Sequence, residues 1–282
     1  SVQPDACGAI NTNAVGRKLY AFLQASAELD RATLAMETRV RDACREAATI
    51  LGVSPMGDTK TVCKNAITAL DQHLAVSVST ESRLVTRTTP PVCTTDVDFT
   101  AGIVAECEAS VAADVNVSCQ GSCNGTCNGA CNGTCATEAS GGVCAGECDG
   151  TCNGRCTGSC QGYASVDASA ECKASAEVRA NVRTTCTEPR VEVVRQDVTV
   201  VDDSKLQLAM RAIDAALPDL LSVGAQAELA AKALVNWGTT LGGVINSAGD
   251  LIENLGERTV CVAEQFGAAI AAVGQIEARV SV

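Results

Sequence analysis

Fourteen of the 18 cysteines are arranged as a mirror image within the chain. Two arrays, CQGSCNGTCNGACNGTC at 119–135 and CAGECDGTCNGRCTGSC at 144–160, place a cysteine at every fourth position. The two positions of every mirrored pair add up to 279, and the rule continues outside the arrays. The mirrored pairs are Cys93 with Cys186, Cys107 with Cys172, Cys119 with Cys160, Cys123 with Cys156, Cys127 with Cys152, Cys131 with Cys148, and Cys135 with Cys144.

A constant sum is the rule for directly opposed residues in an antiparallel pair of strands. Pro90 and Pro189 obey the same sum. We therefore predict one long β-hairpin over residues 90–189, with its tip at 136–143. Opposed Cα atoms in such a pair lie about 4.5–5.5 Å apart, which a disulfide tolerates. Because all the spacings are even, the seven predicted disulfides share one face of the hairpin.

Small apolar residues fill that same face. Alanine, valine and cysteine dominate alternate positions of 95–117 and 162–184, and the sum of 279 brings the two sets together. Since two strands cannot bury such a face alone, we expect it to pack on helices or on another copy. If this strand were fully extended, the 42 residue steps from Cys93 to Cys135 would span roughly 140 Å at about 3.3 Å per residue. The Asn-Gly steps leave an alternative, because successive tight turns would coil the chain.

The composition restricts the classes of protein to consider. The chain has 282 residues, 18 cysteines, a net charge of -12, 2% aromatic residues and one histidine. The acidic balance argues against a nucleic-acid partner. An even number of cysteines favours disulfides and an oxidising compartment. We take the chain as a mature secreted form whose leader is removed, extracellular or at the cell surface, and no apolar run predicts a transmembrane helix.

Metal binding and redox catalysis are two other possible roles for the thiols. Structural zinc sites accept two to four residues between ligands, so the spacing alone permits a metal cluster. A cluster gives no reason for the mirrored cysteines outside the arrays, and we predict that no metal or other cofactor is bound. Redox catalysis needs one activated thiol pair rather than a ladder. No nucleophile–base pair or phosphate loop is present, so we predict no enzyme activity and no catalytic residue.

The rest of the sequence has helical periodicity. Apolar residues at three- and four-residue steps predict helices near 14–52 and 58–76, a helix from about Asp203, and a further helical stretch from Pro218 to about 279. Four cysteines lie in this part and allow three connectivities. We prefer Cys44 with Cys63 and Cys7 with Cys261.

These elements predict an α+β fold in three segments. An N-terminal helical segment covers 1–80, a disulfide-stapled β-hairpin covers 81–202, and a C-terminal helical segment at 203–282 packs on the N-terminal helices. The expected architecture is a bundle of about four long helices that carries the disulfide-laddered hairpin.

The preferred function is that of a non-enzymatic secreted structural protein. It would be the subunit of an extracellular filament, spike or surface layer that assembles with itself through the helices and the stapled ribbon. Helices flanking a central hairpin resemble the layout of the cytolysin A-type pore-forming toxins, and this resemblance, in element order alone, implies a toxin as an alternative. The tip consists of glycine and cystine, so we do not expect membrane insertion. A third alternative is an ice-binding or adhesive surface formed by polar residues such as Asn124, Thr126, Asn132 and Thr134.

Overall fold

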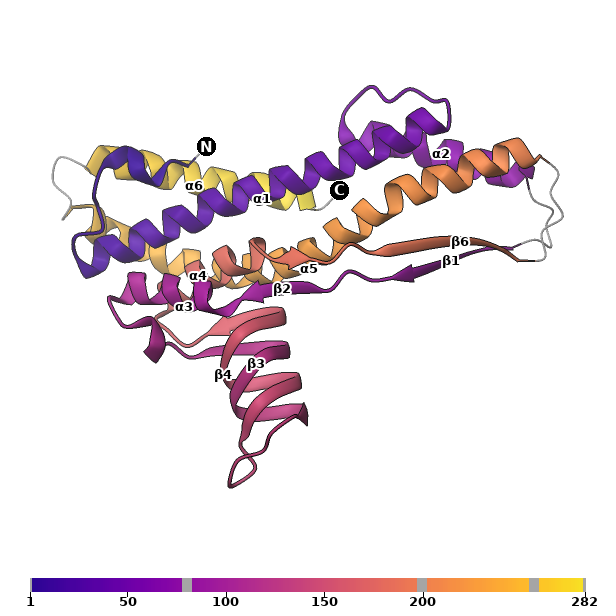
Figure 1. The fold of residues 1–282 in the computed structure, drawn as a ribbon. Coiled ribbons are helices and arrows are strands. Elements are labelled where there is room, and N and C mark those ends of the chain that lie inside the picture. Colours follow the sequence, from indigo (N-terminus) through magenta and orange to yellow (C-terminus); the bar gives the residue numbers. More distant parts are fainter. Residues whose placement is uncertain (1, 78–82, 197–201, 254–258, 281–282) are drawn as a thin grey trace. The chain divides into compact units, whose positions relative to one another are not determined.

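The computed structural model describes all residues except 1, 78–82, 197–201, 254–258 and 281–282 (Figure 1). The described residues form an α+β fold with six α-helices and antiparallel strands. The helices are α1 (Ala14–Ile50), α2 (Thr59–Ser77), α3 (Val97–Glu108), α4 (Ala170–Val182), α5 (Asp203–Glu253) and α6 (Thr259–Val280), with 3₁₀ turns η1 (Pro4–Cys7) and η2 (Ala112–Asp114). The strands are β1 (Arg83–Thr89), β2 (Cys93–Asp96), β3 (Val117–Cys135), β4 (Cys144–Val166), β5 (Thr185–Cys186) and β6 (Arg190–Gln196).

The two N-terminal helices end within two residues of their predicted bounds. The C-terminal part differs, because Pro218 lies inside α5 instead of opening a new helix. A proline within a helix removes one backbone hydrogen bond, and the long run of helix-favouring residues on both sides outweighs this loss. Among the described residues, α5 ends at Glu253 and α6 begins at Thr259.

The chain divides into two compact units. The first contains residues 1–33, 92–185 and 226–281, and the second contains 34–91 and 186–225. The predicted boundary between residues 80 and 81 falls outside the described residues, and the division into three segments stays a prediction.

The core of the second unit is built from small residues of α1, α2 and α5. Ala48 and Val62 are completely buried, and alanines of α5, among them Ala212, belong to the same cluster. A disulfide joins Cys44 of α1 to Cys63 of α2. The strands β1 and β6 form a two-stranded antiparallel sheet in this unit.

The helical core of the first unit centres on its few large side chains. Phe22 of α1 stacks on Trp237 of α5 with ring centroids 4.8 Å apart, and Phe266 of α6 lies against Phe22 at 5.5 Å. A disulfide joins Cys7, at the end of η1, to Cys261 of α6.

The predicted hairpin over residues 90–189 is wrong as a continuous pair of strands. Helices α3 and α4 interrupt it, one on each side, and the architecture is not a clear four-helix bundle with one long hairpin. Ala101 and Ala105 are four residues apart, a spacing that satisfies both the strand and the helix period, and alanine favours the helix. The carboxylate of Asp96 caps α3 by accepting a hydrogen bond from the Phe99 N–H at 3.0 Å.

The register predicted from the sum of 279 is correct for the strands β1 and β6, which flank residues 90–189. In the β1–β6 sheet, Arg83 lies opposite Gln196 and Thr89 lies opposite Arg190, so opposed positions add up to 279. The other sheet has the strand order β3-β4-β2-β5. It contains the cysteine arrays.

Candidate functional site

The structure joins the mirrored cysteines by disulfides. Within the arrays the Cα atoms of bonded cysteines lie 5.5–5.9 Å apart. The bond between Cys107 and Cys172 connects α3 to α4 rather than two strands. Cys93 and Cys186 are also both disulfide-bonded, and none of the 18 cysteines is free. The bonds inside the arrays are Cys119–Cys160, Cys123–Cys156, Cys127–Cys152, Cys131–Cys148 and Cys135–Cys144.

The bonded cysteines are not directly opposed, which corrects the predicted register. Val117 pairs with Val166 and Cys135 pairs with Cys148, so opposed positions in β3 and β4 add up to 283 rather than 279. The glycines of the two arrays pair with the same sum of 283, as Gly129 does with Gly154. Because the sequence repeats every four residues, a shift of four still places glycine opposite glycine. The four-residue repeat therefore does not distinguish the two registers.

The β3–β4 ribbon is coiled rather than straight (Figure 1). Many residues of β3 have two partners on β4, one within the ribbon and one in the next turn. Cys119 pairs with both Ala164 and Cys152, and Gly129 pairs with both Gly154 and Cys144. The two partners of one residue lie 10 to 12 positions apart, which is the length of one turn in each strand. We call residues 117–166 the cystine coil.

The disulfides form the core of the cystine coil. Eight of the ten half-cystines in the arrays are at most 1% exposed, although no helix covers the outer part of the coil (Figure 1). Cys131 and Cys135, next to the tip, are half-buried. The cysteine and glycine part of the predicted apolar face is therefore turned inward and buried within the coil, whereas most of its alanine and valine part lies in α3 and α4.

Glycine allows the two strands of the coil to approach closely. A Cβ atom added to Gly129 would lie 2.4 Å from the carbonyl oxygen of Asn153 and 2.7 Å from the Cα atom of Gly154. At Gly125, where φ is +152°, a Cβ atom would lie 2.1 Å from the Thr157 carbonyl oxygen. Only glycine fits these contacts without a backbone shift. The Asn-Gly steps lie in extended strands rather than in successive tight turns.

The outer surface of the cystine coil is polar. The cysteines of the four-residue units point inward, and the asparagines that follow four of them, such as Asn124, Asn128 and Asn153, are exposed. Thr126 and Thr151 are half-buried. This surface is an array of amide and hydroxyl groups without aromatic side chains.

The base of the coil is held by side chains that take the place of a neighbouring strand. Residues Thr94–Asp96 of β2 pair with residues 159–161 of β4. Beyond them, the Asn181 amide accepts a hydrogen bond from the Ala164 N–H and donates one to the Ala164 carbonyl oxygen. Asn181 is completely buried on α4. The edge of β4 is in this way satisfied without a further strand.

Glu177 of α4 is a buried carboxylate in the same region. It is completely buried and accepts four hydrogen bonds. The Lys173 ammonium is 3.9 Å away. Burial, followed by the negative charge of Glu177, raises the pKa of Tyr163 well above its ordinary value. The donors are the Tyr163 hydroxyl at 2.9 Å, the Ser165 hydroxyl at 2.8 Å, the Val166 N–H at 3.3 Å and the Asn236 amide at 2.9 Å.

A second charged group ties α4 to α1 within the first unit. Glu28 of α1 is nearly buried and accepts hydrogen bonds from Arg179 at 3.0 Å and from Arg183 at 2.8 and 2.9 Å. The Arg183 guanidinium also lies over the Phe99 ring, 4.9 Å from its centroid. Neither Glu177 nor Glu28 stood out in the sequence, although a single Glu among buried Ala176, Val178 and Ala180 was an available signal.

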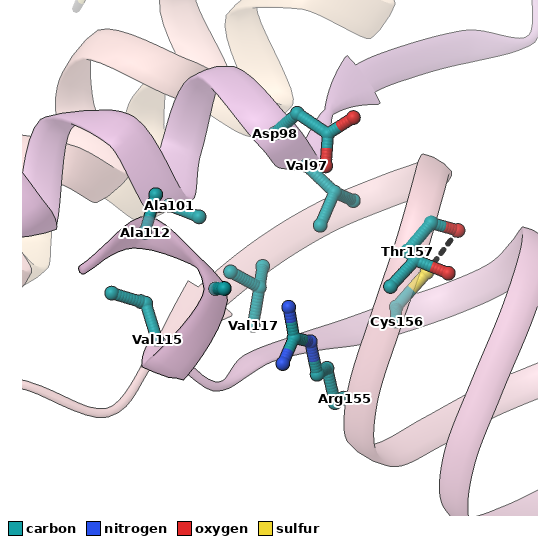
Figure 2. Close-up of a pocket in the computed structure, with 10 residues that line it drawn as sticks. Val97, Asp98, Ala101, Ala112, Val115, Val117, Arg155, Cys156 and Thr157 are labelled. Atoms are coloured by element: carbon teal, nitrogen blue, oxygen red, sulfur yellow. Dashed lines mark hydrogen bonds between the residues drawn. The ribbon is translucent and has the colours of Figure 1, made fainter.

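A cavity of about 330 Å³ lies between α3, η2 and the first turn of the cystine coil (Figure 2). Val97, Ala101, Val115 and Val117 provide apolar walls. The guanidinium of Arg155 points into this space (Figure 2). The remaining lining residues are Asp98, Ala112, Ala113, Cys156 and Thr157.

Among the described residues, no three His, Cys, Asp or Glu side chains are grouped as metal ligands would be. None of the described helices combines the length and the hydropathy that a bilayer span requires. Comparisons with protein-family models, curated proteins and solved structures found no match to this chain.

Proposed function

We propose that this protein is a non-enzymatic structural component of an extracellular surface, with the cystine coil as a rigid projecting spike. The observation that carries the proposal is the coil's own core. Eight half-cystines are at most 1% exposed, although β2, α3 and α4 cover the coil only at its base. A protein element with a covalent core keeps its shape when it projects into solvent, where an ordinary two-stranded ribbon is only marginally stable.

The base of the coil supports the same proposal. A spike transmits force to its anchor only if the junction is rigid. Glu177 connects β4, α4 and α5 by hydrogen bonds, and the disulfide Cys107–Cys172 joins α3 to α4 at the base. The disulfides indicate folding in an oxidising compartment. Location outside the cell and self-assembly are parts of the proposal.

Self-assembly requires a different surface from the one first expected. The cysteine and glycine face of the ribbon lies inside the coil and offers nothing to a second copy. In the first unit, Val235 and Val260 are 66% and 70% exposed on α5 and α6. We propose that contacts between copies use helix surfaces such as these, which leaves the coil free.

Immunogold labelling of the producing cells tests the spike. An antibody against residues 136–143, at the tip of the coil, should label intact cells. A matched antibody against residues 259–268 of α6, which belong to the proposed contacts between copies, should label mainly detergent-treated material. Negative-stain microscopy of the labelled surface should show the tip antibody farthest from the cell. Labelling confined to the cell interior, or a protein found only in solution as a monomer, would contradict the proposal.

A second candidate, an ice-binding or adhesive surface, is favoured by the regular outer face of the coil. Exposed asparagines recur every four residues along the strand. Paired strands in successive turns of the coil lie about 4.8 Å apart. Thermal hysteresis of the purified protein tests this, with Thr126→Lys as the disrupting change. The toxin alternative stays a prediction. Leakage of dye from loaded vesicles on addition of the protein would support it.

A further inference from the structure

The wall of the cystine coil has a gap at residues 155–158 of β4. On the edge of β4 away from its β3 partner in the ribbon, β2 pairs with residues 159–161. Farther along the same edge, the start of β3 pairs with Thr151 and Cys152, and the Ser118 hydroxyl donates to the Gly154 carbonyl oxygen. Within the described part of the chain, residues 155–158 have a strand partner on one side only.

The cavity of Figure 2 lies at this gap. Arg155, Cys156 and Thr157 of the gap form one wall. The opposite walls include Val97, the first residue after β2, and Val117, the first residue of β3. The chain leaves the edge of β4 at Asp96, passes through α3 and η2, and returns at Val117. The cavity therefore occupies the place where a continuing strand would lie.

Two charged side chains, Arg155 and Asp98, line the cavity. Among the described residues, none forms a hydrogen bond or ion pair with the Arg155 guanidinium, which points into the apolar space (Figure 2). A guanidinium matches a carboxylate with two parallel hydrogen bonds. Asp98 also lines the cavity, next to Val97 and apart from Arg155 (Figure 2). The two ends of the cavity thus differ in charge.

We propose that this gap binds a short extended peptide that carries a carboxylate. The peptide adds to the edge of β4 in line with β2 and forms backbone hydrogen bonds with residues 155–158. Its small apolar side chains contact Val97 and Val117. Its carboxylate, from an Asp or Glu side chain or from a chain terminus, binds Arg155. The cavity volume of about 330 Å³ is at the lower end of the range for ligand pockets.

Fluorescence anisotropy with the full, oxidised chain tests the proposal. Three labelled probes distinguish the source of the carboxylate: Ala-Val-Thr-Val with a free C-terminus, amidated Val-Asp-Val-Thr, and amidated Val-Asn-Val-Thr. We expect one of the two acidic probes to bind at concentrations below about 1 mM and the Asn probe to bind at least about tenfold more weakly. Hydrogen exchange of the amides of residues 155–158 should slow when the acidic probe is bound.

Two variants and one modified probe decide the outcome. Arg155→Gln should weaken binding of the acidic probe by about tenfold or more. The matched change Arg211→Gln, at an exposed position on α5, should leave binding unchanged. N-methylation of the probe backbone should abolish binding, because an edge-strand complex requires the peptide N–H groups. The proposal is overturned if neither acidic probe binds, if Arg155→Gln binds like the unmodified chain, or if the N-methylated probe binds equally well.

Discussion

Cys119 is bonded to Cys160 but lies opposite Ala164. In a flat ribbon, an offset of four residues would place the two bonded Cα atoms about 13 Å apart along the strand. They are 5.5 Å apart. Each disulfide in the arrays therefore crosses the inside of a strongly curved ribbon. The disulfides can form only when the ribbon is coiled.

Close contact between the strands predicts that Gly129→Ala destabilises the coil. The added Cβ would meet backbone atoms at 2.4 and 2.7 Å, and both belong to a strand that the disulfides hold in place. We expect a loss of about 3 kcal/mol in the free energy of unfolding, at the upper end of the range for overpacking. Guanidinium unfolding of the oxidised protein measures it.

The control for this change is Gly102→Ala in α3. No atom lies within 4 Å of a Cβ added there, and alanine favours helix over glycine by about 0.5–1 kcal/mol. Gly102→Ala should leave stability unchanged or raise it. If Gly129→Ala is as harmless as its control, the close contact between the strands is not required.

The burial of the half-cystines predicts the order of reduction. With a small phosphine as reductant, Cys135–Cys144 should open first, because Cys135 is half-buried next to the tip. Cys127–Cys152 and Cys119–Cys160 should open last, because all four of these cysteines are completely buried. Alkylation at increasing times followed by mass spectrometry gives the order. Reduction in random order would contradict a solid cystine core.

Removal of the buried carboxylate at the base predicts a large loss of stability. Glu177→Leu leaves the hydroxyl of Ser165 and the N–H of Val166 without their acceptor, and we expect a loss of about 3 kcal/mol or more. Glu177→Gln should cost less, because the amide oxygen can still accept two of these hydrogen bonds. Glu171→Gln, which loses only a half-exposed ion pair with Lys18 at 3.4 Å, should cost less than about 1 kcal/mol. Equal effects at positions 171 and 177 would refute the role of Glu177.

The raised pKa of Tyr163 predicts a decline of stability in alkaline solution. An unfolded tyrosine loses its proton near pH 10, whereas the buried Tyr163 keeps it to higher pH. The folded state then holds more protons than the unfolded state, so the free energy of unfolding falls as the pH rises above about 10. Tyr20 also has a raised pKa, chiefly through its hydrogen bond to Asp5, and acts in the same direction.

Phenolate absorbance isolates this effect. The chain has two tyrosines, so Tyr20→Phe leaves Tyr163 as the single tyrosine. At about pH 11 we expect no phenolate signal from this folded variant and a full signal after unfolding. A folded variant that titrates near pH 10 would show that Tyr163 is accessible to water.

Much of this arrangement could be predicted from the cysteine positions. The sum of 279 selects the pairs that the structure bonds inside the arrays, and it is the true register of Thr89 and Arg190 in the β1–β6 sheet. The register of the coil could not be predicted, because a four-residue repeat looks the same after a shift of four. The position of Val117 opposite Val166 depends on curvature, which glycine permits but the spacing does not specify.

The base of the coil was less predictable. Alanine at every fourth position is compatible with both a strand and a helix, so the pattern alone does not distinguish α3 from a strand. Arg155 looked like any polar residue of the repeat, because the gap beside it exists only once β2 and the start of β3 are placed on the same edge of β4. Sites of this kind arise from three-dimensional pairing and leave no local pattern in the sequence.

The chain enters and leaves the cystine coil at the same end, which makes the length of the coil a variable independent of its base. Adding three four-residue units to each arm would extend the coil by about one turn, since the two partners of one β3 residue lie 10 to 12 positions apart on β4. No residue of α3 or α4 would have to change. The length of such a coil is therefore set by the number of copies of a twelve-base-pair unit in the gene.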